Sequence, residues 1–228
     1  MSGPVFEGMT EDWAEVDGTT IRYLAGGAGP PVLLLHGVAG FCFSWRENFA
    51  ALVPQFRVIA PDLPGVGYSE RRSKIDVSLS GLARYLFGLL DALQVNSTHI
   101  VASSHGGAVA MQMAAQHPER IRSMALAAPL NPYAKHYRKR IGFAGSWAGS
   151  AFVKLAPWAA IPLQRYAIGR MYGDPKRMPP GTADGYCRPL RIPGTIPHLL
   201  QVLRRLPADL QKLRSEFAAI ADVPTLLI

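Results

Sequence analysis

Residues 100–116 read IVASSHGGAVAMQMAAQ, and this stretch decides the fold. It opens with an apolar run at 100–103, which is typical of a short buried strand. It continues into an Ala- and Met-rich run at 107–116 that predicts a helix, ended by Pro118. The turn between them contains the small residues Ser104 and Gly106, which allow a sharp reversal of the chain. The sequence therefore predicts a strand that leads directly into a helix, with Ser104 at the turn.

Apolar runs and helical periodicities alternate on both sides of this unit. Two antiparallel strands are predicted at 13–16 and 20–24, because Asp17-Gly18 between them is a hairpin signal. Further strands, all expected to be buried, are predicted at 31–35, 58–60, 123–128 and 223–228, and helices at 44–52, 78–93 and 208–220. This alternation predicts an α/β fold with a mostly parallel sheet and helices on both faces.

Residues 131–205 interrupt this alternation with short apolar helical pieces and many Pro and Gly. They contain 13 Lys and Arg but only two acidic residues, a charge of +11 within a total of +8, so the rest of the chain carries −3. We expect a core at 1–130, a helical cap at 131–205 and a return to the core at 206–228. The basic surface is interpreted as a solvated face, or as one that steers anionic substrates or rests on an acidic membrane. Nucleic-acid binding is not expected, because no stacking aromatics or recognition motif accompany the charges.

The composition, 49% hydrophobic and 18% charged over 228 residues, is typical of a globular domain. The two cysteines, Cys42 and Cys187, lie too far apart in sequence to indicate a disulfide framework or a zinc site. The N-terminal residues have no basic flank or apolar stretch typical of a secretory signal, and prolines and Lys154 interrupt the weakly charged stretch 141–163. We expect a cytoplasmic protein with no membrane span. No metal-ligand spacing is present, and the glycines at 26–29 precede a strand instead of a helix, so no metal or cofactor is expected.

The turn at Ser104 carries the strongest chemical signal. A serine presented on a tight strand-to-helix turn needs small residues two positions to either side, and Ser104 has Ala102 and Gly106 there. Ser103 would have larger residues in those places. Ser104 is therefore the predicted nucleophile, and the His105 amide at the start of the helix is a predicted oxyanion donor. A helix-capping serine is the alternative explanation of the same residues.

A second motif, LLLHGVAG at 33–40, is a strand that runs into a glycine-containing loop. The backbone N–H of Val38 in this loop is the predicted second oxyanion donor. Histidine in such a loop is more often structural than a proton carrier. The predicted substrate-binding residues are His36, Gly37, Phe41 and Phe43.

Together these motifs resemble the α/β-hydrolase fold family, in its serine-nucleophile, esterase- or lipase-like branch with a helical cap. The matching pieces are the His36-Gly37 loop, the stretch APDLPGVGYS at 60–69, the Ser104 turn and the strand at 224–228. The resemblance implies a cofactor-free serine hydrolase that cleaves a carboxylic ester or similar acyl compound through an acyl-enzyme. The basic surface of residues 131–205 adds anionic and lipid-like small molecules to the expected substrates. The resemblance also implies that Asp62 accepts backbone hydrogen bonds in a turn. Serine at position 104, where dehalogenating and epoxide-opening relatives carry Asp, argues against both of those activities.

A serine nucleophile needs a base, usually a histidine oriented by a carboxylate. In the family the acid follows the strand that here ends at Ile228, and the base lies further on, so we expect the chain to be truncated at its C-terminus. The alternative acid position, after the strand ending near Ala128, holds Asn131. His136 and His198 of the predicted cap are candidate substitutes for the base. Two other classes stay open: another reaction on the same fold, such as C–C bond hydrolysis, peptidase-like cleavage or perhydrolysis, and a non-catalytic remnant.

Overall fold

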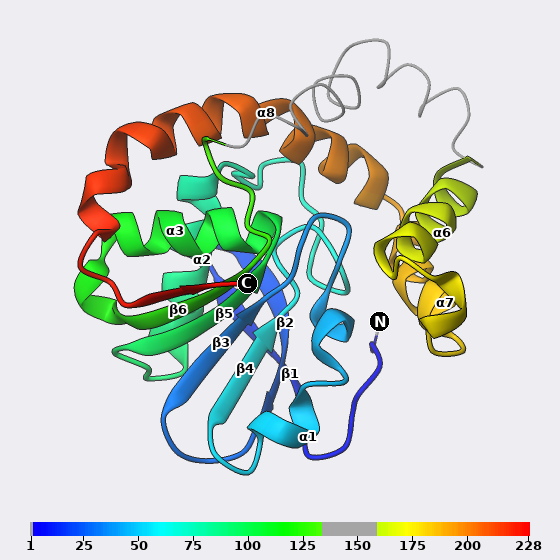
Figure 1. Ribbon diagram of the computed structural model, residues 1–228, viewed down its shortest axis with the longest axis horizontal. Helices are drawn as coiled ribbons and strands as arrows, with labels where there is room; N and C mark the ends of the chain where they lie inside the picture. The colour runs from blue at the N-terminus through cyan, green and yellow to red at the C-terminus, as the bar shows by residue number, and fades with distance from the viewer. Residues whose placement is uncertain (1, 134–158) are drawn as a thin grey trace.

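The computed structural model describes residues 2–133 and 159–228, which are arranged around a twisted sheet (Figure 1). The described strands pair in the order β1-β2-β4-β3-β5-β6-β7. Their bounds are β1 Thr10–Val16, β2 Thr19–Gly26, β3 Pro31–Leu35, β4 Arg57–Pro61, β5 Thr98–Ser103, β6 Ile121–Ala127 and β7 Thr225–Leu227. β2 pairs antiparallel with β1 and β4, and the remaining pairs are parallel. The predicted mostly parallel α/β sheet is confirmed.

Helices cover both faces of the sheet, and the strand side chains alternate between two cores. Leu33 and Leu35 of β3 belong to the core that includes α2 (Leu79–Ala92), α3 (His105–Gln116) and α8 (Thr195–Glu216). Leu34 belongs to the second core, with residues of η1 (Cys42–Trp45) and α1 (Phe49–Leu52). This two-sided burial explains why the strand is apolar at every position.

The prediction of one helix over 44–52 is wrong, because this segment forms the two short helices η1 and α1. Asp62 accepts a hydrogen bond from the Cys42 amide at 2.8 Å, so the first turn starts before the apolar periodicity indicates. Asn48 then takes the N-cap position of α1, without a side-chain hydrogen bond to the helix.

The helix expected at 208–220 also differs from the prediction. The helix predicted at 208–220 is part of the longer α8, followed by η6 (Phe217–Ile220), so the expected boundary after residue 205 falls inside α8. Pro207 lies within this helix, although proline usually ends one. The helix continues because it buries a row of side chains at spacings of three and four: Leu199, Val202, Leu206, Leu210 and Leu213.

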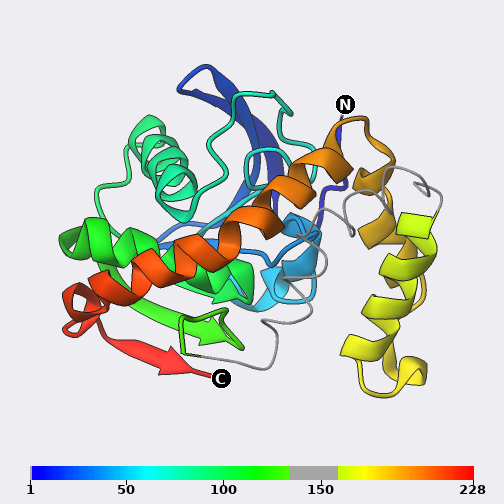
Figure 2. The same cartoon turned by 90° about the horizontal axis from the view of Figure 1, so that it is seen from above.

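The described part of 131–205 is mainly short and helical. It contains α6 (Ala160–Met171), η4 (Pro175–Arg177), α7 (Thr182–Cys187) and η5 (Pro189–Arg191) before α8 begins. Figure 2 shows α8 running from the α6 and α7 side of the molecule across to α3. None of the helices that the structure describes has both the length and the apolar character needed to cross a membrane.

β7 forms as a strand, but the prediction that it is buried is wrong. Leu226 is 60% exposed, Leu227 68% and Ile228 77%. Among the described strands β7 pairs only with β6, which places it at the edge of the sheet (Figures 1 and 2). An apolar run does not distinguish a central strand from an edge strand, because position in the sheet is a property of the whole fold.

Candidate active site

The turn between β5 and α3 holds Ser104 in an unusual backbone conformation. Its φ is 50° and its ψ is −116°, a combination that non-glycine residues rarely adopt and that costs on the order of 1–3 kcal/mol. Small neighbours permit the turn: Ala102 is fully buried, and a Cβ on Gly106 would lie 2.5 Å from the Leu35 carbonyl oxygen. Ser104 itself is only partly buried. The turn therefore presents the hydroxyl of Ser104 on a strained and tightly packed support.

The loop formed by residues 36–40, which we call the 36–40 loop, runs directly beside this serine. A Cβ on Gly37 would lie 3.2 Å from the Ser104 Cβ and 3.7 Å from its Oγ. Among the hydrogen bonds of the described residues, none uses the Val38 amide as donor. The His105 amide is the first of α3 and so has no acceptor one turn earlier in its helix. Two backbone donors predicted for the oxyanion thus come from segments that flank Ser104.

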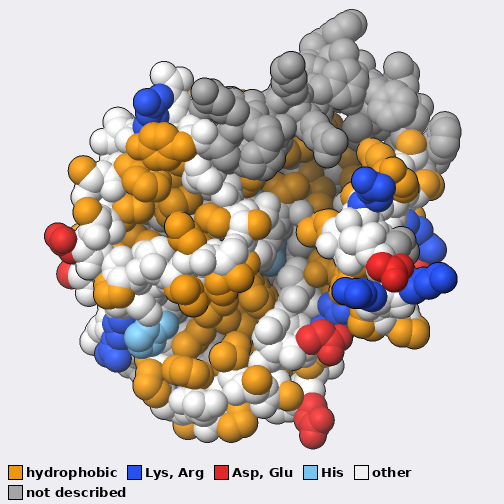
Figure 3. Space-filling view, viewed as in Figure 1, with side chains coloured by type: hydrophobic (Ala, Val, Ile, Leu, Met, Phe, Trp, Pro, Cys, Tyr) orange, Lys and Arg blue, Asp and Glu red, His pale blue; other side chains and the backbone are white. Residues whose placement is uncertain are grey.

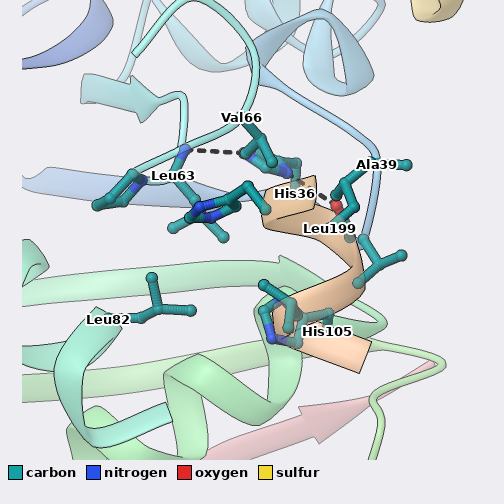
Figure 4. Close-up of a pocket in the computed structure, with 12 residues that line it drawn as sticks. His36, Ala39, Leu63, Val66, Leu82, His105 and Leu199 are labelled. Atoms are coloured by element: carbon teal, nitrogen blue, oxygen red, sulfur yellow. Dashed lines mark hydrogen bonds between the residues drawn. The ribbon is translucent and has the colours of Figure 1, made fainter. Parts of the chain in front are cut away.

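The His36 side chain holds the 36–40 loop in place. Its ring is buried, Nδ1 donates to the Gly37 carbonyl at 2.9 Å, and Nε2 accepts from the Leu63 amide at 3.0 Å (Figure 4). This assigns the neutral tautomer with the proton on Nδ1, and burial lowers the pKa of the ring further. His36, a predicted substrate-binding residue, also lines the pocket beside this loop, although both its nitrogens are engaged by backbone groups of the protein.

A narrow pocket with a cavity volume of about 10 Å³ opens beside the 36–40 loop (Figure 4). Its walls come from this loop, from the loop after β4, and from α2, α3 and α8. The wall residues outside the 36–40 loop are Leu63, Pro64, Val66, Leu82, His105, His198, Leu199 and Val202. Apart from its histidines the lining is apolar, and in this conformation the space is about the size of a single water molecule.

The pocket brings His105 and His198 together, although one follows Ser104 and the other belongs to α8. Burial, with the nearby His36 and His198, lowers the pKa of His105 to about 4. Burial and the Arg71 guanidinium lower the pKa of His198 to about 4, although the Pro64 carbonyl, its hydrogen-bond acceptor, acts in the opposite direction. Both rings are therefore neutral at neutral pH. The other candidate base, His136, lies outside the described residues.

Phe41 and Phe43 do not line this pocket. Their rings stack with centroids 5.4 Å apart, and the edge of the Tyr186 ring from α7 meets Phe43 at 5.2 Å. Arg46 lies over the Phe43 ring at 4.3 Å. A Cβ on Gly185 of α7 would fall within 3 Å of the Phe43 ring. These two side chains thus join the core to α7 in the described structure.

A buried ion pair behind the 36–40 loop was missed from the sequence. Asp62 accepts backbone hydrogen bonds in its turn, from the amides of Cys42 and Tyr68, each at 2.8 Å. It also pairs with Arg22 of β2 at 3.1 Å, and neither side chain is exposed. The requirement that a buried carboxylate has a cationic partner could have indicated a buried Arg or Lys, but no sequence pattern singles out Arg22.

No group of three or more metal-ligand side chains is assembled in the part of the chain that the structure describes. Among the same described residues, one histidine is hydrogen-bonded to a carboxylate: His117 Nδ1 contacts Glu119 Oε1 on the exposed surface. No such pair adjoins Ser104.

Known proteins with similar sequences or structures have the same architecture. The family model for the alpha/beta hydrolase fold matches residues 30–150. The chain is 36% identical over 119 residues to the dihydrolipoyllysine-residue acetyltransferase component of the acetoin cleaving system of Cupriavidus necator, which covers 52% of this chain and 32% of that protein. It is 36% identical over 104 residues to 2-hydroxymuconate semialdehyde hydrolase of a Pseudomonas species, covering 44% and 36%. The matches thus span about a third of the length of these relatives.

Solved structures share the fold over nearly the whole chain. Cfl2 from Burkholderia cenocepacia superposes with a TM-score of 0.83 at 21% identity, covering 97% of this chain and 88% of that one. The haloalkane dehalogenase DbeA from Bradyrhizobium elkani has a TM-score of 0.79 at 24% identity, covering 96% and 79%. The family match extends over more than half of the residues and the fold agrees with it, so this chain belongs to the α/β hydrolase fold family.

Proposed function

We propose that this chain carries the nucleophile and oxyanion site of a serine hydrolase that cleaves a carboxylic ester or a similarly activated acyl compound. Ser104 Oγ attacks the carbonyl carbon, and the Val38 and His105 amides hydrogen-bond the oxyanion that forms. The alcohol leaves, and water then hydrolyses the acyl-enzyme. The observation that carries the proposal is the strained φ of 50° at Ser104, next to the glycine of the 36–40 loop.

The apolar walls of the narrow pocket adjoin the 36–40 loop, so a small acyl or alcohol group that displaces these side chains would keep the carbonyl near the two amides. We also propose that residues 131–205 act as a cap over this site. Lys and Arg side chains gather over the α6 and α7 surface (Figure 3), where Arg165, Arg170, Lys176 and Arg177 are exposed. This surplus favours anionic or lipid-like substrates.

The attack also needs a base, and the described residues offer one candidate from outside the core motifs. His198 is neutral and lines the pocket with the 36–40 loop, but it has no carboxylate partner among the described hydrogen bonds. A His198→Gln variant tests this role. Loss of turnover comparable to Ser104→Ala would assign the base to His198, whereas retained turnover would assign it elsewhere.

Hydrolysis of p-nitrophenyl esters of increasing acyl length tests the proposed reaction. We expect turnover of short esters by the chain and a loss of at least about 1,000-fold in Ser104→Ala, because the nucleophile is removed. Ser103→Ala is the matched control, one residue away on β5, and should retain activity. Equal rates for Ser104→Ala and the unsubstituted chain would refute the proposal.

C–C bond hydrolysis is a second candidate, favoured by two relatives. The chain is 36% identical over 104 residues to 2-hydroxymuconate semialdehyde hydrolase and, over a stretch of the same length, to 2-hydroxy-6-oxo-2,4-heptadienoate hydrolase from Pseudomonas putida. Such a reaction adds water across a C–C bond next to a carbonyl group. Turnover of a 1,3-diketone, with no turnover of any ester in the series, would favour this reaction over ester hydrolysis.

A further inference from the structure

Arg22 is a fully buried cation that lies away from the pocket. Its side chain comes from β2, on the strand face that carries Leu24, and its exposed fraction is zero. Every nitrogen of the guanidinium has a partner. Nε donates to Glu11 Oε1 at 2.6 Å, Nη2 to the Pro4 carbonyl at 2.7 Å, and Nη1 to Asp62 Oδ2 at 3.1 Å and to the Cys42 sulfur at 2.9 Å.

The Asp62 carboxylate transmits this arrangement to the 36–40 loop. Its Oδ1 accepts from the Cys42 amide at 2.8 Å, two residues beyond the loop. The next residue, Leu63, donates its amide to His36 Nε2 at 3.0 Å, at the start of the loop. Both ends of the loop are therefore tied to residues 62 and 63. Arg22 in turn donates a hydrogen bond to the Asp62 carboxylate, which accepts the hydrogen bond from the Cys42 amide.

Stability does not account for this arrangement well. A buried ion pair loses much of its Coulombic attraction to desolvation, and apolar residues of similar volume often give equal or greater stability. Around Arg22 the second core is apolar, with Leu24, Leu34 and Phe41 fully or nearly fully buried. What an apolar pair could not supply is a carboxylate that fixes the Cys42 amide.

We propose that Arg22 is a positioning residue, which orients Asp62 so that the 36–40 loop keeps the Val38 amide beside Ser104. This inference rests on the proposed function, since the amide matters only if an oxyanion forms there. Displacing a reacting or stabilising group by about 1 Å costs on the order of 100-fold in rate. Arg22 therefore acts on the chemistry without touching the substrate.

The test compares three variants. Arg22→Lys keeps the charge but loses the forked geometry that reaches four partners. Arg22→Met removes the charge as well. Glu11→Gln is the matched control, because it removes a carboxylate on the other side of Arg22 and leaves the contacts to Asp62 and Cys42 intact. For each variant we would measure the second-order rate of fluorophosphonate labelling at Ser104 and the amide hydrogen exchange of residues 37–42. Both measurements are made well below the Tm of that variant.

We expect Arg22→Lys to label about 10- to 100-fold more slowly and to exchange faster at residues 37–42, while Glu11→Gln stays within about threefold in labelling. If Arg22→Met does not fold, the comparison of labelling and amide exchange between Arg22→Lys and Glu11→Gln decides the question. Equal labelling and equal loop exchange in Arg22→Lys and the unsubstituted chain would overturn the inference. The inference would also be overturned if the loss in labelling rate were proportional to the loss in unfolding free energy in all three variants. If the unsubstituted chain does not label at Ser104, the proposed function fails, and the exchange of residues 37–42 alone decides whether Arg22 positions the loop.

Discussion

Gly106 shows at the scale of a single residue how closely the turn at Ser104 is packed. A Cβ at this position would lie 2.5 Å from the Leu35 carbonyl oxygen and 2.6 Å from that of His36, both of which are backbone atoms. Such atoms move only if β3 or α3 moves. Helix α3 can therefore lie this close to the 36–40 loop only because residue 106 has no side chain.

A Gly106→Ala substitution should separate β3 from the start of α3. We expect a loss of about 1–3 kcal/mol in the free energy of unfolding, from overpacking, and loss of fluorophosphonate labelling at Ser104. Gly169→Ala in α6 is the matched control, because a Cβ there meets nothing within 4 Å and Ala favours helix. Urea denaturation of both variants gives the comparison. Equal stabilities for the two variants would show that the turn tolerates a Cβ.

His198 links the pocket to the pH dependence of stability. Its pKa is about 4 in the folded chain, against about 6.5 for an ordinary histidine, so the unfolded chain binds the proton more readily. The contribution to stability is present above pH 6.5 and is lost as the pH falls toward 4. Between pH 7.5 and 5.0 the loss amounts to about 2 kcal/mol.

A His198→Gln variant should remove this loss, since glutamine does not titrate and can still donate to the Pro64 carbonyl. We expect the unsubstituted chain to lose about 2 kcal/mol more than the variant between pH 7.5 and 5.0 in urea titrations. NMR titration of the His198 imidazole provides the independent measurement. A stability difference between the two proteins that is constant with pH would contradict the account.

Residues with a local signal could be predicted from the sequence, and those defined by distant packing could not. The turn at Ser104 follows from small residues at fixed spacing, and the acceptor role of Asp62 was implied by the resemblance to the α/β-hydrolase fold family. Arg22 had no comparable signal. It alternates with Ile21 and Tyr23 on β2, which suggests a solvent-facing position, but η1 and the N-terminal segment cover that face.

At the scale of elements, the strands of the sheet were predicted because buried parallel strands are apolar throughout. The structure gives β3 the predicted bounds and extends β4 and β5 by one or two residues at their ends. The sequence was a poorer guide to the bounds of helix α8 and to the burial of strand β7. α8 depends on burial against α3 and passes through Pro207, and the exposure of β7 depends on which strands lie beside it.

The exposed apolar strand β7 predicts self-association of the chain. Leu227 is 68% exposed at the sheet edge, and unpaired apolar edges promote edge-to-edge contact. Leu227→Lys should therefore reduce light scattering at high protein concentration and change the free energy of unfolding by no more than about 0.5 kcal/mol.

Leu126 on the neighbouring strand β6 is the comparison for this substitution. It is 1% exposed, so Leu126→Ala should cost about 2–5 kcal/mol. If Leu227→Lys were as destabilising as Leu126→Ala, the Leu227 side chain would be covered in solution, and the edge position described above would be wrong.

At the scale of the whole molecule, the pocket exists only because segments far apart in sequence meet. The 36–40 loop, the loop after β4 and α8 supply walls that no single motif encodes. Gly65 is the point of closest approach, because a Cβ there would collide with the His198 ring. Arg71 completes the junction by donating to Thr195 Oγ1 at 2.7 Å. These contacts explain why the sequence predicted the sharp turn at Ser104 but not the pocket beside it.

Gly65→Ala should displace α8 from the core. Gly65 has a φ of 85°, and Gly173, with a φ of 70° and nothing within 4 Å of its Cβ position, is the matched control for backbone strain. We expect Gly65→Ala to lose about 1–3 kcal/mol more unfolding free energy than Gly173→Ala. The difference should shrink in a His198→Ala background. A difference that persists there would mean that His198 is not the group that Gly65 accommodates.

The most direct test of the central claim is a crystal structure of the chain after reaction with a fluorophosphonate. The account predicts phosphorus bonded to Ser104 Oγ, with the phosphoryl oxygen about 2.7–3.1 Å from the amide nitrogens of Val38 and His105. An adduct on Ser103 or another residue, or a phosphoryl oxygen that points away from both amides, would contradict it.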